Sequence, residues 1–204
     1  MNILVTGGAG FIGSALAKQL TELGHSVVVL DNFNEYYCVQ LKRDRADEFL
    51  TDVDVVEGDM LDEALLDEMF AKYDFEVVCH LAANAGVRYS IDQPRQVVEA
   101  NVSGTVTILE AMKRHHVSRI VFASTSSVYG NDTTSPFLES ATAAQPMSVY
   151  GASKRADELL LYTYFVLFGI QATCFRFFTV YGPWSRPDMA MLKFAQLITK
   201  GKPI

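Results

Sequence analysis

Three glycines spaced three residues apart near the start of the chain do most to limit what it can fold into. They lie in the stretch TGGAGFIG at 6–13, between the apolar run Ile3–Val5 and an amphipathic stretch. Gly7 permits a tight turn, Gly10 lets the backbone approach a pyrophosphate, and Gly13 lets the following helix pack on the strand. The pattern therefore predicts a dinucleotide-binding unit, although its G-x-x-G-x-x-G spacing differs from the G-x-G-x-x-G of most dehydrogenases.

An acidic residue after the second predicted strand distinguishes between two forms of the cofactor. This strand covers 26–30 and is followed directly by Asp31, which lies 18 residues beyond Gly13. A carboxylate at this place accepts hydrogen bonds from the ribose hydroxyls and repels a 2′-phosphate. The sequence therefore predicts NAD rather than NADP. Because strand, helix and acid are all present, a purely structural glycine turn is the weaker interpretation.

Short apolar runs alternate with helical patterns along the whole chain, which is typical of a parallel sheet covered on both faces. The fold class that we predict is α/β, a Rossmann-type doubly wound parallel sheet. We expect strands near 3–5, 27–30, 53–56, 77–81, 120–123 and 172–177. We expect helices over about 13–23, 39–50, 63–73, 95–116, 149–168 and 189–200, and a loop over 131–148.

The last part of the sequence is short for a protein of this design. We assign 1–182 to a NAD-binding domain and 183–204 to the start of a truncated substrate-binding region. A doubly wound sheet binds its ligand at the strand ends, and the residues after the last predicted strand are too few for a covering domain. We therefore expect a fragment in which the usual C-terminal substrate-binding domain is largely missing. The alternative is a natural short form with a cap made of loops.

Composition and charge argue against several kinds of partner. The net charge is −7 and there is no basic run, which disfavours nucleic acid and anionic membrane surfaces. No apolar run reaches membrane-spanning length, and no signal peptide precedes the first strand. The three scattered cysteines, Cys38, Cys79 and Cys174, predict free thiols, two of them buried in strands, and no metal site. We expect a cytoplasmic protein.

A tyrosine and a lysine four positions apart indicate the chemistry. Tyr150 and Lys154 lie on one face of a predicted helix. The ammonium group can lower the pKa of the phenol, which then takes a proton from a sugar or alcohol hydroxyl. Helices supply this pattern by chance, but beside a dinucleotide site it predicts hydride chemistry. The hydroxyl-rich stretch 124–130 follows the fifth strand and can hold the reacting oxygen.

Taken together, the motifs resemble those of a known family, the extended short-chain dehydrogenase/reductases of the nucleotide-sugar epimerase/dehydratase type. They occur in family order and are TGGAGFIG at 6–13, DNFN at 31–34, GDM at 58–60, HLAA at 80–83, NVSGT at 101–105, STSSVYG at 124–130, YGASK at 150–154 and RFFTVYGP at 176–183. Three further stretches are most similar to the UDP-glucuronate 4-epimerase subfamily, namely YYCVQLKRDR at 36–45, AGVRYS at 85–90 and GPWSRPDMA at 182–190. Asn84 departs from the glutamine of the subfamily motif.

The resemblance implies roles for individual residues. Tyr150 would be the base, Lys154 its activator and ribose anchor, and Thr125 the hydroxyl of a catalytic triad. Besides Tyr150 and Lys154, NAD would contact Gly7, Gly10, Phe11, Ile12, Gly13, Asp31, Asn32, Asp59, Met60, Leu81, Ala82 and Ala83. The sugar or its carboxylate would meet Arg88, Ser126, Ser127, Thr179 and Arg186. An arginine suits a carboxylate because its planar fork binds both oxygens, and a surface ion pair is the alternative for either arginine.

The activity that the resemblance implies is NAD-dependent 4-epimerisation of a nucleotide sugar, with UDP-glucuronate and UDP-galacturonate as the pair interconverted. Tyr150 would take the proton of the 4-hydroxyl while C4 gives hydride to NAD. The hydride would return to the opposite face of a 4-keto sugar. The resemblance also implies a homodimer, formed through the predicted helices at 95–116 and 149–168.

Other activities stay open. Epimerisation of UDP-glucose needs no arginine for a carboxylate and is the nearest alternative. Dehydration or oxidative decarboxylation is disfavoured, because Ser126 and Ser127 stand where such relatives carry carboxylates. A truncated module that binds NAD without catalysis is the alternative from a different class, and the intact Tyr150 and Lys154 argue against it.

Overall fold

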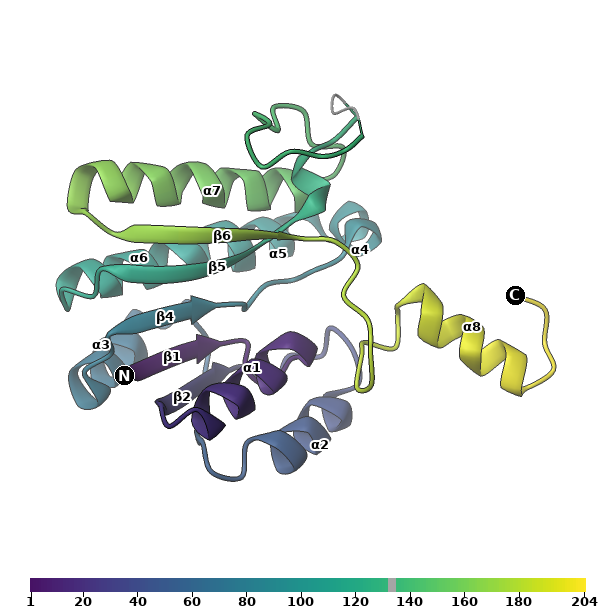
Figure 1. Ribbon diagram of the computed structural model, residues 1–204, viewed down its shortest axis with the longest axis horizontal. Coiled ribbons are helices and arrows are strands. Elements are labelled where there is room, and N and C mark those ends of the chain that lie inside the picture. Colours follow the sequence, from purple (N-terminus) through teal and green to yellow (C-terminus); the bar gives the residue numbers. More distant parts are fainter. Residues whose placement is uncertain (132–134) are drawn as a thin grey trace.

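The computed structural model describes residues 1–131 and 135–204. In this part of the chain, a parallel sheet of six strands has the order β3-β2-β1-β4-β5-β6 (Figure 1). Its strands are β1 (Asn2–Thr6), β2 (Ser26–Asp31), β3 (Asp54–Glu57), β4 (Val77–His80), β5 (Arg119–Thr125) and β6 (Gln171–Phe177). The predicted doubly wound sheet is confirmed. The strand order reverses between β1 and β4, which is where such sheets bind ligands at their carboxyl ends.

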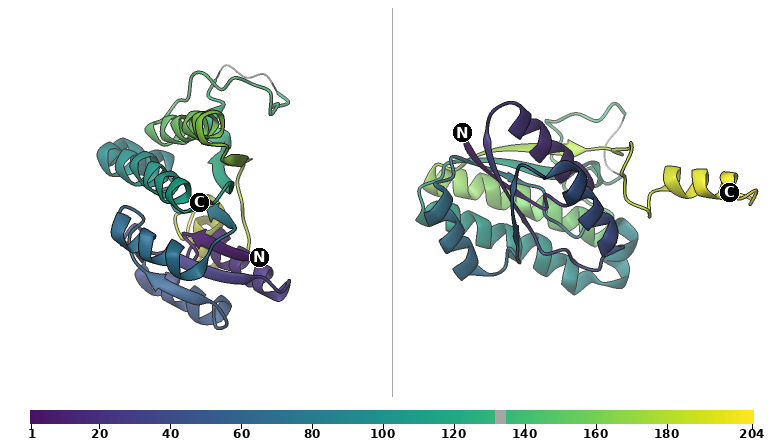
Figure 2. Two further views of the ribbon diagram at one scale, coloured as in Figure 1. Left: turned by 90° about the vertical axis from the view of Figure 1, so that its left-hand side faces the viewer. Right: turned by 90° about the horizontal axis from the view of Figure 1, so that it is seen from below.

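Helices cover the two faces of the sheet (Figure 2). On one face lie α1 (Phe11–Glu22) and α2 (Val39–Phe49), and on the other α3 (Glu63–Tyr73), α6 (Gly104–Arg114) and α7 (Val149–Phe168). Successive strand residues point to opposite faces, so neighbours enter different cores. Leu4 packs in the cluster that contains Leu66 and Ile108, while Val5 packs in the cluster that contains Ala17. Both faces are thus buried, which explains why the strands are almost continuously apolar.

The helix expected over 95–116 is present, but it is not α-helical throughout. It runs as α5 (Pro94–Val98), a π-helix (Glu99–Ser103) and then α6, and the short helix α4 (Val87–Asp92) precedes it. Pro94 begins α5, because its fixed φ and missing N–H suit a first helical turn. The π-turn buries Asn101, whose side chain accepts from Asn84 N at 2.8 Å and donates to Ser153 Oγ at 2.9 Å. It thereby ties the segment after β4 to α7.

The helix that carries the tyrosine and lysine has the predicted bounds, Val149–Phe168. Its first turn is capped by Ser148, whose Oγ accepts from Gly151 N at 3.0 Å. Gly169 ends it in the left-handed region, at φ 74°. Of the loop expected over 131–148, residues 132–134 lie outside the described part, and the remainder contains turns and bends but neither helix nor strand.

The sheet has an exposed edge at β6, where the residues from Gln171 to Phe175 are exposed. Cys174 is therefore exposed rather than buried as expected, while Cys79 is buried as expected and all three cysteines are free. Beyond this strand, α8 (Ala190–Thr199) projects away from the sheet and buries none of its residues (Figure 1). Among the described residues, no helix combines the length and apolar character needed to span a bilayer.

Candidate active site

A pocket of about 850 Å³ opens where the carboxyl ends of β1, β4 and β5 meet. It lies between the glycine loop after β1, the segment after β4, the first turn of α7 and the segment 177–189. The structure brings together in its lining every residue predicted for catalysis, cofactor or sugar except Arg88. These residues are Gly7, Gly10, Phe11, Ile12, Gly13, Asp31, Asn32, Asp59, Met60, Leu81, Ala82, Ala83, Thr125, Ser126, Ser127, Tyr150, Lys154, Thr179 and Arg186.

The glycine loop forms a tight cradle in which side chains do not fit. Gly7 has φ +69°, and a Cβ on it would lie 2.7 Å from Ala82 N. A Cβ on Gly13 would collide with the carbonyl oxygen of Gly7 and lie 2.8 Å from Gly8 Cα. The loop leads directly into α1, which begins at Phe11. Bare backbone at a helix N-terminus fits the pyrophosphate of a dinucleotide, so these residues suit NAD.

Asp31, at the end of β2, holds the glycine loop as well as facing the pocket. Its carboxylate accepts from Ala9 N at 3.0 Å and from Phe33 N at 2.9 Å. Burial raises the pKa of this carboxyl, although the two backbone hydrogen bonds and nearby Lys42 act in the opposite direction. Each oxygen keeps a further lone pair. The predicted ribose contact is therefore compatible with this second role, which the sequence analysis missed.

Tyr150 and Thr125 lie side by side in the pocket, as the triad prediction requires. Burial raises the pKa of the Tyr150 phenol, while a hydrogen bond with the Thr125 side chain and the positive charge of Arg186 act to lower it. Thr125 Oγ1 also accepts from Ser127 N at 3.2 Å, which fixes the turn after β5. A phenol, a hydroxyl and a cation thus line the same pocket.

Lys154 lies one helical turn beyond Tyr150 and is 1% exposed. Its Nζ is 4.3 Å from the centroid of the Phe122 ring. Burial lowers the pKa of this lysine to about 8, and the negative charge of Asp157 opposes that shift. The groups that lower the Tyr150 pKa in this structure are Thr125 and Arg186, so the activating role of Lys154 stays a prediction.

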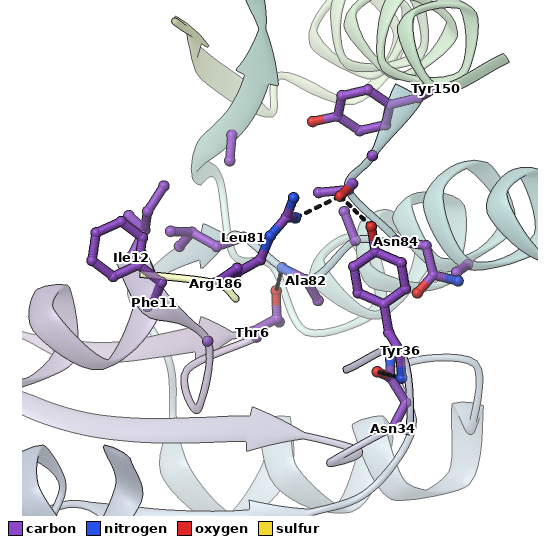
Figure 3. A pocket seen from close by; sticks show the side chains of 18 of the residues that line it. Thr6, Phe11, Ile12, Asn34, Tyr36, Leu81, Ala82, Asn84, Tyr150 and Arg186 are labelled. Carbon is purple, nitrogen blue, oxygen red and sulfur yellow. Dashed lines mark hydrogen bonds between the residues drawn. The ribbon is translucent and has the colours of Figure 1, made fainter. Parts of the chain in front are cut away.

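Of the two arginines predicted for the carboxylate, only Arg186 enters the pocket. Its Nη1 donates to the Ala85 carbonyl, which also accepts from the Tyr36 hydroxyl at 2.8 Å (Figure 3). Its Nε and Nη2 form a fork with the Asp188 carboxylate at 3.1 and 3.0 Å. Arg88 is exposed on α4 and is not part of the lining. The structure therefore separates two residues that the sequence analysis treated alike.

Arg45 is a structural link to the site that the sequence analysis missed. It is 0% exposed on α2. Its Nε and Nη2 donate to the carbonyl of Trp184 at 3.0 and 2.7 Å, and its Nη1 lies 3.4 Å from the carbonyl of Ala9 and donates to the Tyr37 hydroxyl at 2.6 Å. It joins the glycine loop to the segment that carries Arg186. The amphipathic pattern gave no sign of this burial, because arginines on such helices are usually exposed.

A chain of hydrogen bonds supports the pocket wall after β4. Ala82 N donates to Thr6 Oγ1 at 3.2 Å, and this hydroxyl lies 2.6 Å from His80 Nδ1. His80 Nε2 lies 3.1 Å from Thr105 Oγ1, which donates to the carbonyl of Asn101 at 2.6 Å. Burial lowers the pKa of His80 to about 3, with the charge of Lys154 acting in the same direction. A neutral histidine with its proton on Nε2 completes this chain.

A second buried network holds the end of β5. Glu158 on α7 accepts from Ser124 Oγ at 2.6 Å and from both Nε and Nη2 of Arg176, at 3.0 and 2.9 Å. Arg155 adds a further bond at 3.0 Å. Burial acts to raise the pKa of Glu158, but these hydrogen bonds prevail and lower it. The network fixes the strand end next to Thr125.

The chain is similar to proteins of one family along its whole length. Residues 3–204 match the model of the NAD dependent epimerase/dehydratase family. The chain is 47% identical over 206 residues to UDP-glucuronate 4-epimerase 1 of Arabidopsis thaliana, covering 100% of this chain and 48% of that protein. It is 44% identical over 210 residues to the protein CapI of Staphylococcus aureus, covering 100% of this chain and 61% of that protein.

Solved structures with the same fold contain the predicted cofactor. UDP-glucuronic acid 4-epimerase from Bacillus cereus, in complex with UDP-glucuronic acid and NAD, is 35% identical with a TM-score of 0.89, covering 100% of this chain and 64% of that one. Thermus thermophilus UDP-glucose 4-epimerase in complex with NAD is 33% identical, with the same TM-score and the same coverage. The chain thus spans between about half and two thirds of the lengths of these proteins.

Proposed function

The chain belongs to the NAD dependent epimerase/dehydratase family, and from this premise we propose that it is the cofactor-binding and catalytic part of a UDP-glucuronate 4-epimerase. The observation that carries the proposal is the convergence of three features in one pocket. The glycine cradle, the Tyr150 phenol and the Arg186 guanidinium all line it. The first suits a dinucleotide, the second the 4-hydroxyl of a sugar, and the third a sugar carboxylate.

Bound NAD supplies a reversible hydride acceptor, so epimerisation consumes no oxidant. The chain itself moves the proton. Tyr150 takes it from the sugar 4-hydroxyl and later returns it, while the neighbouring Thr125 side chain acts to lower the pKa of the phenol. Because burial raises the phenol pKa, the base depends on Thr125 and on the positive charge of Arg186.

The proposed substrate class is inferred from the chemical groups that line the pocket. Ser126 and Ser127 offer hydroxyls but no carboxyl acid or base, which disfavours dehydration of the sugar. Arg186 offers a planar fork, which is suited to a uronate carboxylate. In the structure this fork holds Asp188, which a substrate carboxylate would have to replace. UDP-glucose epimerisation is the second candidate, because the fold-matched enzyme from Thermus thermophilus bears that name.

The proposal is tested by incubating the purified chain with NAD and UDP-glucuronate and following the sugar by NMR. We expect UDP-galacturonate to appear without net accumulation of NADH. NAD binding is measured separately by calorimetry. If NAD binds but neither UDP-glucuronate nor UDP-glucose is converted, the chain is a NAD-binding module and the proposed activity is wrong for it.

Loss of the Arg186 side chain should separate the two candidate substrates. In Arg186→Leu we expect KM for UDP-glucuronate to rise by about tenfold to a hundredfold, since charge-assisted hydrogen bonds contribute about 1.5–3 kcal/mol. KM for UDP-glucose should change little. Arg88→Leu provides the comparison, because Arg88 is exposed and outside the pocket. A larger effect of the Arg88 change would restore the role that the sequence analysis gave to it.

We further propose that the protein forms a homodimer through α7. The exposed large apolar side chains of this helix include Leu159, Tyr162, Phe165 and Val166, which are 53%, 68%, 50% and 61% exposed. An apolar surface of this kind is typical of an interface. Sedimentation equilibrium should give twice the monomer mass, and a monomer at micromolar concentration would argue against the proposal.

A further inference from the structure

Lys154 and Asp157 form a buried pair of ionisable groups at the pocket. They are three residues apart on α7 and therefore lie on one face of the helix. Lys154 is 1% exposed and Asp157 is 0% exposed. Within the described residues, neither the lysine Nζ nor either carboxyl oxygen has a hydrogen-bond partner. Of the two, only Lys154 lines the pocket, so Asp157 lies behind it.

Among the groups packed around the pair, Asp157 is the one whose negative charge can compensate the positive charge of Lys154. From α6, Thr105 lies beside the carboxyl, but its single proton is donated to Asn101 O at 2.6 Å and would have to be redirected to reach Asp157. From β5, the Phe122 ring faces the ammonium.

The remaining ionisable neighbours of Lys154 are either neutral or already paired with other charged groups. His80 on β4 is neutral, because burial lowers its pKa to about 3. Cys174 on β6 is an exposed residue, but partial desolvation of its thiol raises the pKa to about 11, so the thiol is also neutral. Glu158, the next residue on α7, already accepts from Arg176 and Arg155. Asp157 is therefore the carboxylate available to compensate the lysine charge.

Burial drives both members of the pair toward their neutral forms. It lowers the pKa of Lys154 to about 8 and raises that of Asp157 to about 7, and in each case the charge of the partner acts in the opposite direction. Two buried charged groups that make no hydrogen bond are a poor way to stabilise a fold, since apolar side chains of similar volume do as well or better. The pair is thus better explained by the position of Lys154 at the pocket.

We propose that Asp157 is a positioning residue that keeps the pocket lysine, Lys154, in its ammonium form for the cofactor. The inference deepens the proposed function and rests on it only for the use made of Lys154 at the ribose. An ammonium group makes stronger hydrogen bonds to a ribose hydroxyl than a neutral amine does. The charge of Asp157 also acts to raise the pKa of the Tyr150 phenol.

The coupling is measured directly by NMR on protein with ¹³C-labelled lysine side chains, with the Lys154 signal assigned by its absence in Lys154→Met. In the wild-type chain, Lys154 should titrate below the other lysines. In Asp157→Asn, which has the same side-chain size, its midpoint should fall by about one pH unit or more, because a buried ammonium has lost its opposite charge. An unchanged midpoint overturns the inference. Glu110→Gln is the matched control, since Glu110 pairs with Lys113 and Tyr164 instead.

The effect on the cofactor is measured by calorimetric titration with NAD over a range of pH. In Asp157→Asn, the Kd for NAD should rise about tenfold near pH 8 and return toward the wild-type value as the pH falls and Lys154 regains its proton. A Kd that is raised equally at every pH indicates a structural defect and overturns the inference. If the wild-type chain fails to bind NAD, the proposed function is wrong, while the lysine titration still decides the coupling.

A reciprocal variant, Lys154→Met, tests the same coupling independently in case Asp157→Asn does not fold. Coupling between two sites acts equally in both directions. In Lys154→Met, the Asp157 carboxyl carbon should therefore titrate at a higher pH than in the wild-type chain. An unchanged midpoint overturns the inference by a route that leaves Asp157 in place.

Discussion

Replacement of Tyr150 by phenylalanine should lower the turnover of UDP-glucuronate by about 10²–10⁴-fold, the range in which a positioned acid or base contributes. The phenylalanine keeps the ring in its half-buried place and removes only the hydroxyl that is proposed to exchange the substrate proton. NAD affinity should stay near the wild-type value, because the pyrophosphate and adenine contacts predicted for the glycine cradle are untouched. Turnover is followed by NMR of the sugar, and NAD binding by calorimetry.

Tyr36→Phe is the matched comparison for this substitution. It removes a phenol from the same pocket, but that hydroxyl is engaged in donating to the Ala85 carbonyl. We expect a much smaller loss of turnover in this variant. Equal turnover in Tyr150→Phe and the wild-type chain would rule out Tyr150 as the base. The pH profile adds a second check, because turnover that needs the phenolate should rise with pH toward the raised pKa of Tyr150.

The substitution Gly13→Ala should have the largest effect on cofactor binding. A methyl group at this position collides with the Gly7 carbonyl oxygen and lies 2.8 Å from Gly8 Cα, and both of these are backbone atoms that no side-chain rotation can move. Relief requires α1 to move away from β1, which costs about 1–3 kcal/mol of stability. The displacement also distorts the helix N-terminus that faces the pyrophosphate, so NAD affinity should fall by tenfold or more, on the order of 1.4 kcal/mol.

Gly24→Ala separates this collision from a general cost of replacing a glycine. Gly24 has φ +82°, and a Cβ there would meet no atom within 4 Å. Its replacement should cost about 1 kcal/mol through backbone strain alone and leave NAD affinity unchanged. Urea denaturation and calorimetry measure the two quantities. If both variants bind NAD like the wild-type chain, the glycine loop is not the pyrophosphate site.

The pocket depends on contacts between parts of the chain that are far apart in sequence. Arg45 reaches the Trp184 carbonyl across 139 positions and also approaches the glycine loop at Ala9. The segment that presents Arg186 is in this way joined to the cradle predicted to hold NAD. One buried guanidinium thus connects the parts of the site that are predicted to bind cofactor and substrate.

Much of the fold and most of the site followed from the sequence, because the signals are local. The strand, glycine turn and helix that begin the chain are consecutive, and the apolar runs identify the strands by composition alone. Val149–Phe168 was predicted at its true bounds, and the structure shows a capping serine before it and a glycine after it. Tyr150 and Lys154 then lie one turn apart by helix geometry, without any knowledge of the rest of the molecule.

Only the tertiary structure decided how charged and polar side chains are distributed between surface and interior. The sequence could not tell that Arg186 enters the pocket while Arg88 stays in solvent, or that Asp157 is buried behind Lys154. It also missed the π-turn that buries Asn101. Local pattern determines which elements form, but the burial of a charge depends on which distant elements pack around it, and that packing exists only in the folded chain.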